Sequence, residues 1–179
     1  MDIITDQSVF IKEAMDSVIG NLTVGMFLTL LVIFFFLREW RHTLIVFISA
    51  PIAVLITLAF MLMFGISLNV MTLSALALGI GIVVDSATVV LENILDRKRH
   101  ALRHNPQVDL VETTSHATEE LFTSLMGGTL TMVVVFLPIV FINQQVKILY
   151  SGLAFTITFA MVASLFVAVT LVPLLASRI

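Results

Sequence analysis

The sequence contains no cysteine, and charged side chains make up only 12% of its 179 residues. The absence of cysteine excludes disulfide bridges and thiolate metal sites. Because a soluble domain carries about 25% charged residues, the scarcity of charge also excludes an ordinary soluble fold. No basic patch with interleaved aromatic residues occurs, so we expect no nucleic-acid partner. The 59% hydrophobic content and the mean hydropathy of +1.12 predict a membrane protein instead.

Long uncharged runs separate the few charged clusters. Crossing a bilayer as a helix requires about 20 apolar residues, and the runs long enough are residues 18–37, 43–64, 68–91, 121–142 and 148–175. We therefore expect an all-α membrane protein, a bundle of about five transmembrane helices with a short cytoplasmic amphipathic link. Residues 1–17 would form an extracytoplasmic lead-in, 18–96 the first three helices, 97–120 the link, and 121–179 the last two helices.

The basic residues predict the orientation of these spans. Of the nine lysine and arginine residues, only Lys12 and Lys147 fall on one side of the five-span arrangement. The other seven fall on the opposite side, which the positive-inside rule assigns to the cytoplasm. The seven are Arg38, Arg41, Arg97, Lys98, Arg99, Arg103 and Arg178. We therefore expect a multi-pass protein with an extracytoplasmic N-terminus and a cytoplasmic C-terminus.

Cysteine labelling tests this orientation in a chain that has no native thiol. In sealed right-side-out vesicles, we expect an impermeant maleimide to label Ser8→Cys and to leave Ser177→Cys unlabelled, since the reagent reaches only extracytoplasmic residues. Labelling of Ser177→Cys before the membrane is permeabilised would contradict the predicted orientation.

The third predicted span carries a stripe of polar and small residues. At about 100° per residue, one helix face holds Ser74, Gly81, Asp85, Thr88 and Glu92. The remaining faces consist mainly of Leu, Ile, Val and Ala, so we expect the stripe to face protein or water rather than lipid. Gly79 and Gly81 remove side-chain bulk beside Asp85, which predicts the close approach of a neighbouring helix.

The presence of Asp85 in an otherwise apolar membrane span requires an explanation. An aspartate at the centre of a membrane helix costs about 2.5–3.5 kcal/mol on insertion scales, and burial favours the neutral carboxyl over the ionised one. A carboxyl that is neutral at one moment and paired with a cation at another is a proton carrier. We predict that Asp85 is a proton site, with a buried structural hydrogen-bonding role as the alternative. Glu92 lies near the cytoplasmic end of the span, where water or Arg97 could satisfy it, and we expect a structural role there.

Two other kinds of site are alternatives to a proton site. An intramembrane aspartyl protease needs two membrane-embedded carboxylates that share a proton, and Asp85 has no second aspartate within the spans. We therefore predict that the protein is not an enzyme. His100 and His104, four residues apart, could bind a metal on a helix. The link offers no adjacent third ligand, so we predict a solvated surface and no metal site.

The stretch GIGIVVDSATVVLENI resembles the fourth transmembrane helix of the resistance–nodulation–division (RND) superfamily of efflux pumps. The shared pattern falls on Gly81, Asp85, Glu92 and Asn93. Other segments agree in order and spacing: TDQSVFIKEAMDSV resembles the lead into the second helix of hydrophobe/amphiphile efflux pumps, FFFLREWRHTLIVFISAPIAVL the third, FGISLNVMTL the entry to the fourth, and FTITFAMVASLFVAVTLVPLL the sixth. The resemblance covers nearly the whole chain.

This resemblance implies that the five spans correspond to the second to sixth helices of a twelve-helix pump in the bacterial inner membrane. It implies antiport of hydrophobic and amphiphilic compounds, driven by the proton-motive force without a cofactor and contributing to multidrug resistance. Asp85 would carry the proton relay. The supporting polar face would consist of Ser74, Gly81, Ser86, Thr88 and Glu92.

The sequence also departs from the family pattern. Ser86 stands where many multidrug members have a second aspartate, although heavy-metal exporters also use a single carboxylate. The family's lysine partner comes from a helix in the second half of the pump, and none of the five spans contains lysine or arginine.

We therefore expect the chain to be inactive alone, with three kinds of partner: the bilayer, the second half and porter domains of a pump, and a homo- or hetero-oligomer. The alternatives are a non-transporting fragment or structural remnant, and a heavy-metal-exporting relative.

Overall fold

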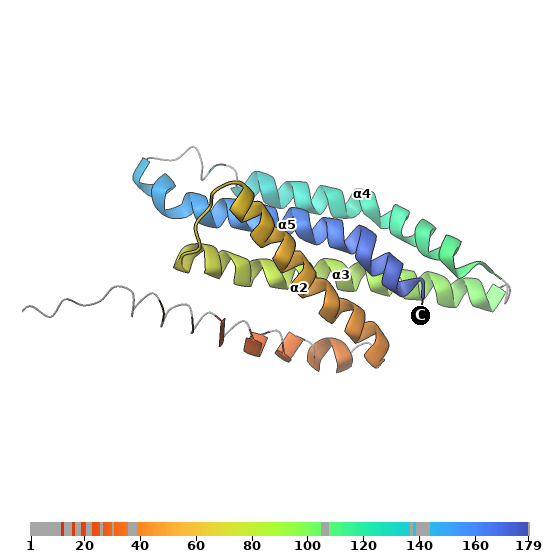
Figure 1. The fold of residues 1–179 in the computed structure, drawn as a ribbon. Helices are drawn as coiled ribbons and strands as arrows, with labels where there is room; N and C mark the ends of the chain where they lie inside the picture. The colour runs from red at the N-terminus through yellow and green to blue at the C-terminus, as the bar shows by residue number, and fades with distance from the viewer. Residues whose placement is uncertain are drawn as a thin grey trace, which may run out of the picture.

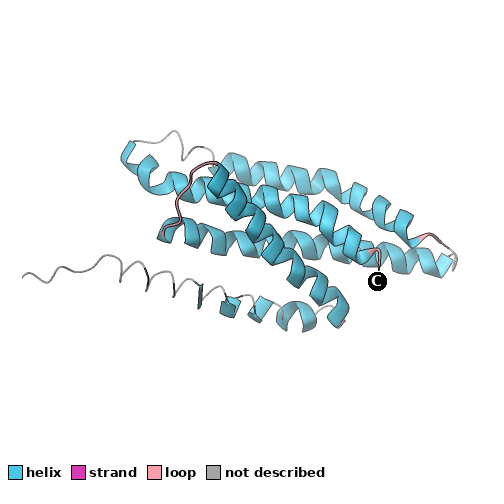
Figure 2. Ribbon diagram, in the orientation of Figure 1, coloured by secondary structure: helices cyan, strands magenta, loops and turns pink. Residues whose placement is uncertain are grey.

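The computed structural model describes residues 39–104, 108–136, 138 and 144–178, and in the N-terminal part residues 12, 16, 19–20, 23–25, 27–29 and 31–35. The predicted lead-in and parts of the first predicted span therefore lie largely outside the described residues. Within the described ranges the regular structure is helical, without a strand (Figure 2). The all-α prediction is confirmed.

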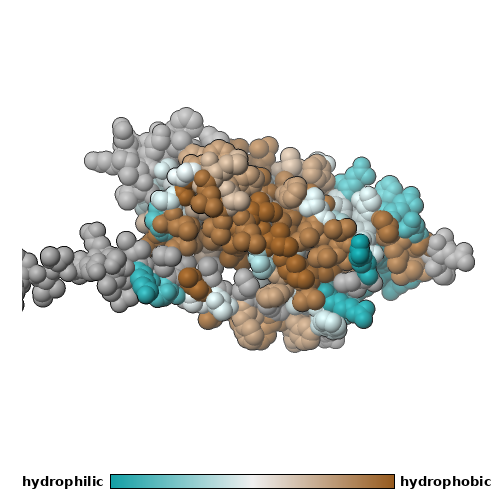
Figure 3. Space-filling view, viewed as in Figure 1, coloured by the Kyte–Doolittle hydropathy of each residue, from teal (hydrophilic) through white to brown (hydrophobic). Residues whose placement is uncertain are grey.

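Four long helices dominate the structure: α2 (Trp40–Met63), α3 (Val70–His104), α4 (Leu110–Phe136) and α5 (Gln144–Ala176). Each contains a stretch long and apolar enough to cross a membrane, and a shorter apolar helix, Thr23–Phe35, lies within the first predicted span. Figure 3 shows hydrophobic side chains over the middle of the molecule and hydrophilic ones gathered at the end where α3 ends and α4 begins. This distribution is typical of a helical bundle in a membrane.

The helices α3 and α5 form the centre of the bundle. Both α2 and α4 pack against each member of this pair, and among these four helices only α2 and α4 do not contact one another. Successive helices run in opposite directions, so the ends of α3 and α5 lie at the same end of the bundle as the starts of α2 and α4 (Figure 1). The third predicted span is therefore central among the described helices, and it packs there through its buried, mostly apolar faces.

Small residues allow α3 and α5 to approach closely. A Cβ atom added to Gly79 would lie 2.6 Å from the Cβ atom of Ala160, so no larger residue fits without a shift of the backbone. Ala87 and Ala163 are fully buried in the surrounding core. Gly81, which was expected to make a similar approach, has no atom within 4 Å of an added Cβ. Of the two predicted packing glycines, only Gly79 contacts a neighbouring helix in the described structure.

The turn between α2 and α3 fixes where the central helix begins. Gly65 has a φ of 68°, a left-handed conformation that favours glycine after a helix, and the N–H of Ile66 donates to the carbonyl of Met61 at 2.9 Å. Asn69 and Thr72 then cap α3 reciprocally. The N–H of Thr72 donates to Asn69 Oδ1 at 2.9 Å, and the N–H of Asn69 donates to Thr72 Oγ1 at 2.8 Å.

The predicted link, residues 97–120, consists mainly of helix ends rather than a separate element. The helix α3 continues to His104 and α4 already begins at Leu110, where Asp109 Oδ1 accepts a hydrogen bond from the N–H of Val111 at 2.8 Å. Hydropathy marks where a helix leaves the hydrocarbon, whereas the helix itself ends where its backbone is capped. The helices α3 and α4 therefore extend beyond the apolar runs of residues 68–91 and 121–142.

Candidate functional site

Asp85 lies near the middle of α3 and lines a cleft of about 580 Å³ between α3 and four residues of the N-terminal part of the chain. Thr88 and Glu92 line the same cleft, and the opposite wall is formed by Leu28, Thr29, Val32 and Ile33. The two carboxylates are seven residues apart, which corresponds to about 10 Å along the helix. The cleft therefore exposes two acidic groups at different depths along one side of α3.

The hydroxyl groups of the polar stripe bond within α3. Each donates to the carbonyl four residues earlier: Ser74 to Val70 at 2.7 Å, Ser86 to Ile82 at 3.0 Å, and Thr88 to Val84 at 2.7 Å. Asp85 and Glu92 make no hydrogen bond or ion pair with the part of the chain that the structure describes. Their side chains are exposed, so this acidic face is not covered by α2, α4 or α5.

The predicted site residues therefore divide into two groups. Asp85, Thr88 and Glu92 share the cleft. Ser74 and Gly81 are exposed outside it, and Ser86 is half-buried on the adjoining side of α3. Helical periodicity correctly placed the stripe on one face but did not show which part of that face borders a neighbouring segment. The roles assigned to these residues stay predictions.

Glu92 does not pair with Arg97, which was one of the two partners, water or Arg97, expected for it. Arg97 forms an ion pair with Glu120 of α4 instead. Asn93, the neighbour of Glu92, donates from Nδ2 to the carbonyl of Ala117 at 2.8 Å. The two residues of the Glu-Asn motif therefore lie in different environments. Glu92 faces the cleft, whereas Asn93 joins α3 to α4.

Lys98 differs most from the sequence-based expectation of a solvated basic link. Its side chain is only 7% exposed, and its Nζ donates to the carbonyl of Ala176, the last residue of α5, at 2.6 Å. Carbonyl groups at a helix C-terminus lack helical donors and carry partial negative charge, so an ammonium group is a favourable partner. On α2, His42 is also buried, with Nδ1 2.9 Å from Glu39 Oε2. No local sequence pattern distinguishes Lys98 from its exposed basic neighbours.

The histidines of the link lie around a small cleft of about 340 Å³. His100 and His104 line it from α3 and His116 lines it from α4, so a third imidazole is nearer than the sequence suggested. Over the described ranges, no three histidine, aspartate or glutamate side chains are arranged to hold a metal ion.

Four apolar helices that are long enough to cross a bilayer define a multi-pass membrane protein. The chain belongs to the AcrB/AcrD/AcrF family of RND efflux pumps, which it matches over residues 1–179. The RND resemblance inferred from the motifs is thereby confirmed.

Several characterised relatives support this assignment. The chain is 37% identical over 166 residues to the swarming motility protein SwrC of Bacillus subtilis, covering 93% of the chain and 16% of SwrC. It is 33% identical over 179 residues to the multidrug resistance protein MdtC of Pectobacterium atrosepticum, covering 100% of the chain and 17% of MdtC. It is 33% identical over 174 residues to the toluene efflux pump membrane transporter TtgE of Pseudomonas putida, covering 97% of the chain and 16% of TtgE. The chain thus spans about a sixth of the length of these relatives.

Proposed function

We propose that the chain forms part of the transmembrane region of a proton-driven efflux pump and that Asp85 takes up and releases the proton. The position of Asp85 is the main support: the carboxylate lies on the central helix, in a cleft, without a cationic partner among the described residues. The relatives that are multidrug resistance proteins and a toluene efflux pump support hydrophobic and amphiphilic compounds as the cargo. The remaining five-sixths of such a protein would supply the cargo-binding parts.

The chemistry of a carboxyl group explains how proton uptake could drive movement. A neutral Asp85 can be covered by an apolar helix, whereas an ionised one requires water or a cation in the cleft. The two protonation states therefore favour different packing against the exposed stripe of α3. A pump that alternates between these states couples proton transfer to a change of conformation. By the family resemblance, the cation would come from a helix of the second half.

The family also supports a location in the bacterial inner membrane. In this arrangement the basic end of the bundle, with Lys98 and Arg97, faces the cytoplasm, and the turn at Gly65 faces the opposite side. The cleft at Asp85 then lies between the two surfaces, where it is reached by protons only through the protein or through water that enters the cleft.

Substitution of Asp85 by asparagine tests the proposal. In membranes containing the 179-residue chain, we expect a protonated-carboxyl infrared band that appears reversibly on acidification and is missing from Asp85→Asn. In a complete pump that contains this segment, Asp85→Asn should retain the fold and abolish export, because an amide keeps much of the hydrogen-bonding capacity but cannot carry the proton.

Glu92→Gln is the matched control, since it neutralises the other carboxylate of the same cleft. We expect it to leave the Asp85 band in place. If Asp85→Asn preserves both the fold and export, Asp85 has a structural role and the proposal is wrong.

A further inference from the structure

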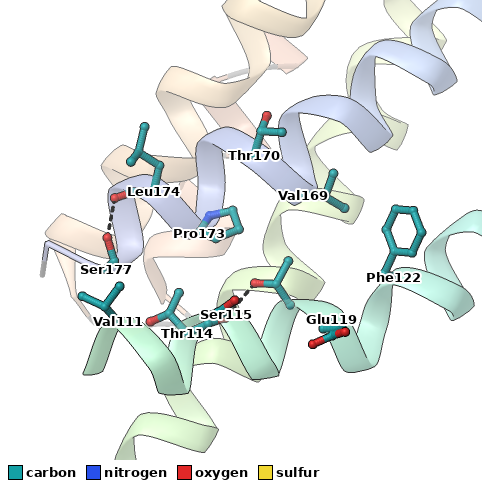
Figure 4. A pocket seen from close by; sticks show the side chains of 11 residues that line it. Val111, Thr114, Ser115, Glu119, Phe122, Val169, Thr170, Pro173, Leu174 and Ser177 are labelled. Atoms are coloured by element: carbon teal, nitrogen blue, oxygen red, sulfur yellow. Dashed lines mark hydrogen bonds between the residues drawn. The ribbon is translucent and has the colours of Figure 1, made fainter. Parts of the chain in front are cut away.

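A larger cleft, of about 720 Å³, lies between the start of α4 and the end of α5 (Figure 4). It shares no residue with the cleft at Asp85. Phe122 and Val169 lie toward one end, Val111 and Ser177 lie toward the other, and Glu119 falls between them along α4 (Figure 4). The volume is within the range of about 300–1,000 Å³ typical of small-molecule sites.

The charge of the residues that line the cleft is negative and favours a cationic ligand. Glu119 is the single charged residue that lines it, and none of its lining residues is a lysine, arginine or histidine. Glu119 makes no ion pair or hydrogen bond within the described parts of the chain, whereas the adjacent Glu120 is paired with Arg97. Ser115, one helical turn before Glu119, also lines the cleft and has no hydrogen-bond partner among the same residues. A carboxylate and a hydroxyl are thus available side by side.

The charge pattern of α4 indicates that the cleft lies near the boundary between the headgroups and the acyl region of a bilayer. Glu119 and Glu120 are the last charged residues of α4 before the uncharged run that begins at Leu121. Phe122 is therefore on the hydrocarbon side of Glu119, while Ser177 is just beyond the end of α5. A ligand that fills this cleft needs a polar part beside Glu119 and an apolar part beside Phe122 and Leu174.

We propose that the cleft binds one phospholipid with a primary ammonium headgroup, as in phosphatidylethanolamine. The ammonium donates to the Glu119 carboxylate, the phosphate accepts from the Ser115 hydroxyl, and the first part of an acyl chain lies against Phe122 and Leu174. A primary ammonium has three donors, whereas the trimethylammonium of phosphatidylcholine has none, so the carboxylate distinguishes these two lipids. Lipid binding at α4 and α5 is independent of the proton site and of the proposed transport.

Native mass spectrometry of the 179-residue chain measures this preference directly. We expect dioleoylphosphatidylethanolamine to bind about tenfold more tightly than dioleoylphosphatidylcholine, as one charge-assisted hydrogen bond permits. Glu119→Gln should remove the preference, and Glu112→Gln should retain it, because Glu112 is an exposed acid of α4 that does not line the cleft. Thr170→Phe should weaken binding of both lipids by filling the cleft from α5. Unchanged helix content by circular dichroism confirms that each variant is folded.

Four results would overturn the proposal. The first is equal binding of the two lipids to the wild-type chain. The second is equal loss of the preference in Glu119→Gln and Glu112→Gln, which would indicate a general effect of helix charge. The third is tighter binding of dioleoylphosphatidylglycerol than of the ethanolamine lipid, which would show an anion site. Soluble O-phosphoethanolamine at the same concentration should not displace the lipid, and displacement would likewise reject a lipid as the occupant.

Discussion

Gly79→Ala is expected to destabilise the bundle by about 1–3 kcal/mol, the usual cost of overpacking a well-packed core. The added Cβ atom would lie 2.6 Å from the Cβ atom of Ala160. Both atoms are attached directly to the backbone and cannot rotate away, so α3 and α5 must separate. Unfolding of the purified chain by increasing mole fractions of SDS, followed by circular dichroism, measures the change.

Gly81→Ala provides the control on the same helix. An alanine there meets no atom within 4 Å, and alanine favours a helix by about 0.8–1 kcal/mol over glycine. We therefore expect no loss of stability. The double variant Gly79→Ala with Ala160→Gly should recover most of the loss, because the second substitution removes the opposing Cβ atom. Equal effects of the two single glycine substitutions would contradict the close approach at Gly79.

Lys98→Met is expected to cost about 1.5–3 kcal/mol, the range for a hydrogen bond to a charged group. Methionine retains much of the apolar stem of the buried lysine but removes the ammonium that donates to the Ala176 carbonyl at 2.6 Å. The end of α5 then loses both a donor and a favourable positive charge. SDS unfolding gives the free-energy change, and hydrogen exchange at the last turn of α5 should increase.

Arg99→Met is the control, since Arg99 is the exposed neighbour of Lys98. An exposed substitution of this kind usually changes stability by less than about 0.5 kcal/mol. If the two substitutions have the same effect, or if exchange in α5 is unchanged by Lys98→Met, the contact between Lys98 and the end of α5 does not contribute to the fold.

Hydropathy and helical periodicity predicted most of the fold but not the ends of the helices. The long apolar runs predicted the membrane helices because unpaired backbone N–H and C=O groups are costly in lipid. An α-helix pairs these groups within a single segment. Charged residues after Leu91 indicated the end of the span, yet α3 continues to His104. Water tolerates a helix as well as a loop, so the end of an apolar run does not determine the end of a helix.

Local sequence patterns did not predict the contacts between residues that are distant in the chain. The sequence offered both Gly79 and Gly81 as packing positions near Asp85, but the rotation of α3 against α5 decides which glycine packs. Lys98 lies within a run of basic residues, and its burial depends on the end of α5, 78 residues later in the chain. For the candidate site, periodicity identified the acidic stripe, while the opposite wall of the cleft, at Leu28, Thr29, Val32 and Ile33, depends on tertiary structure.

Because α3 is long, a small tilt of this helix moves its far end more than it moves Asp85. It is one helix of 35 residues without proline, whereas α2 and α5 contain Pro51 and Pro173. If the tight contact at Gly79 is the fulcrum, Asp85 lies about 9 Å from it and His104 about 37 Å from it, at 1.5 Å per residue. Each degree of tilt then moves the His104 end by about 0.65 Å, roughly four times the displacement at Asp85. In a rigid rotation about this contact, a sub-ångström shift at the carboxylate would correspond to a movement of several ångströms at the His104 end.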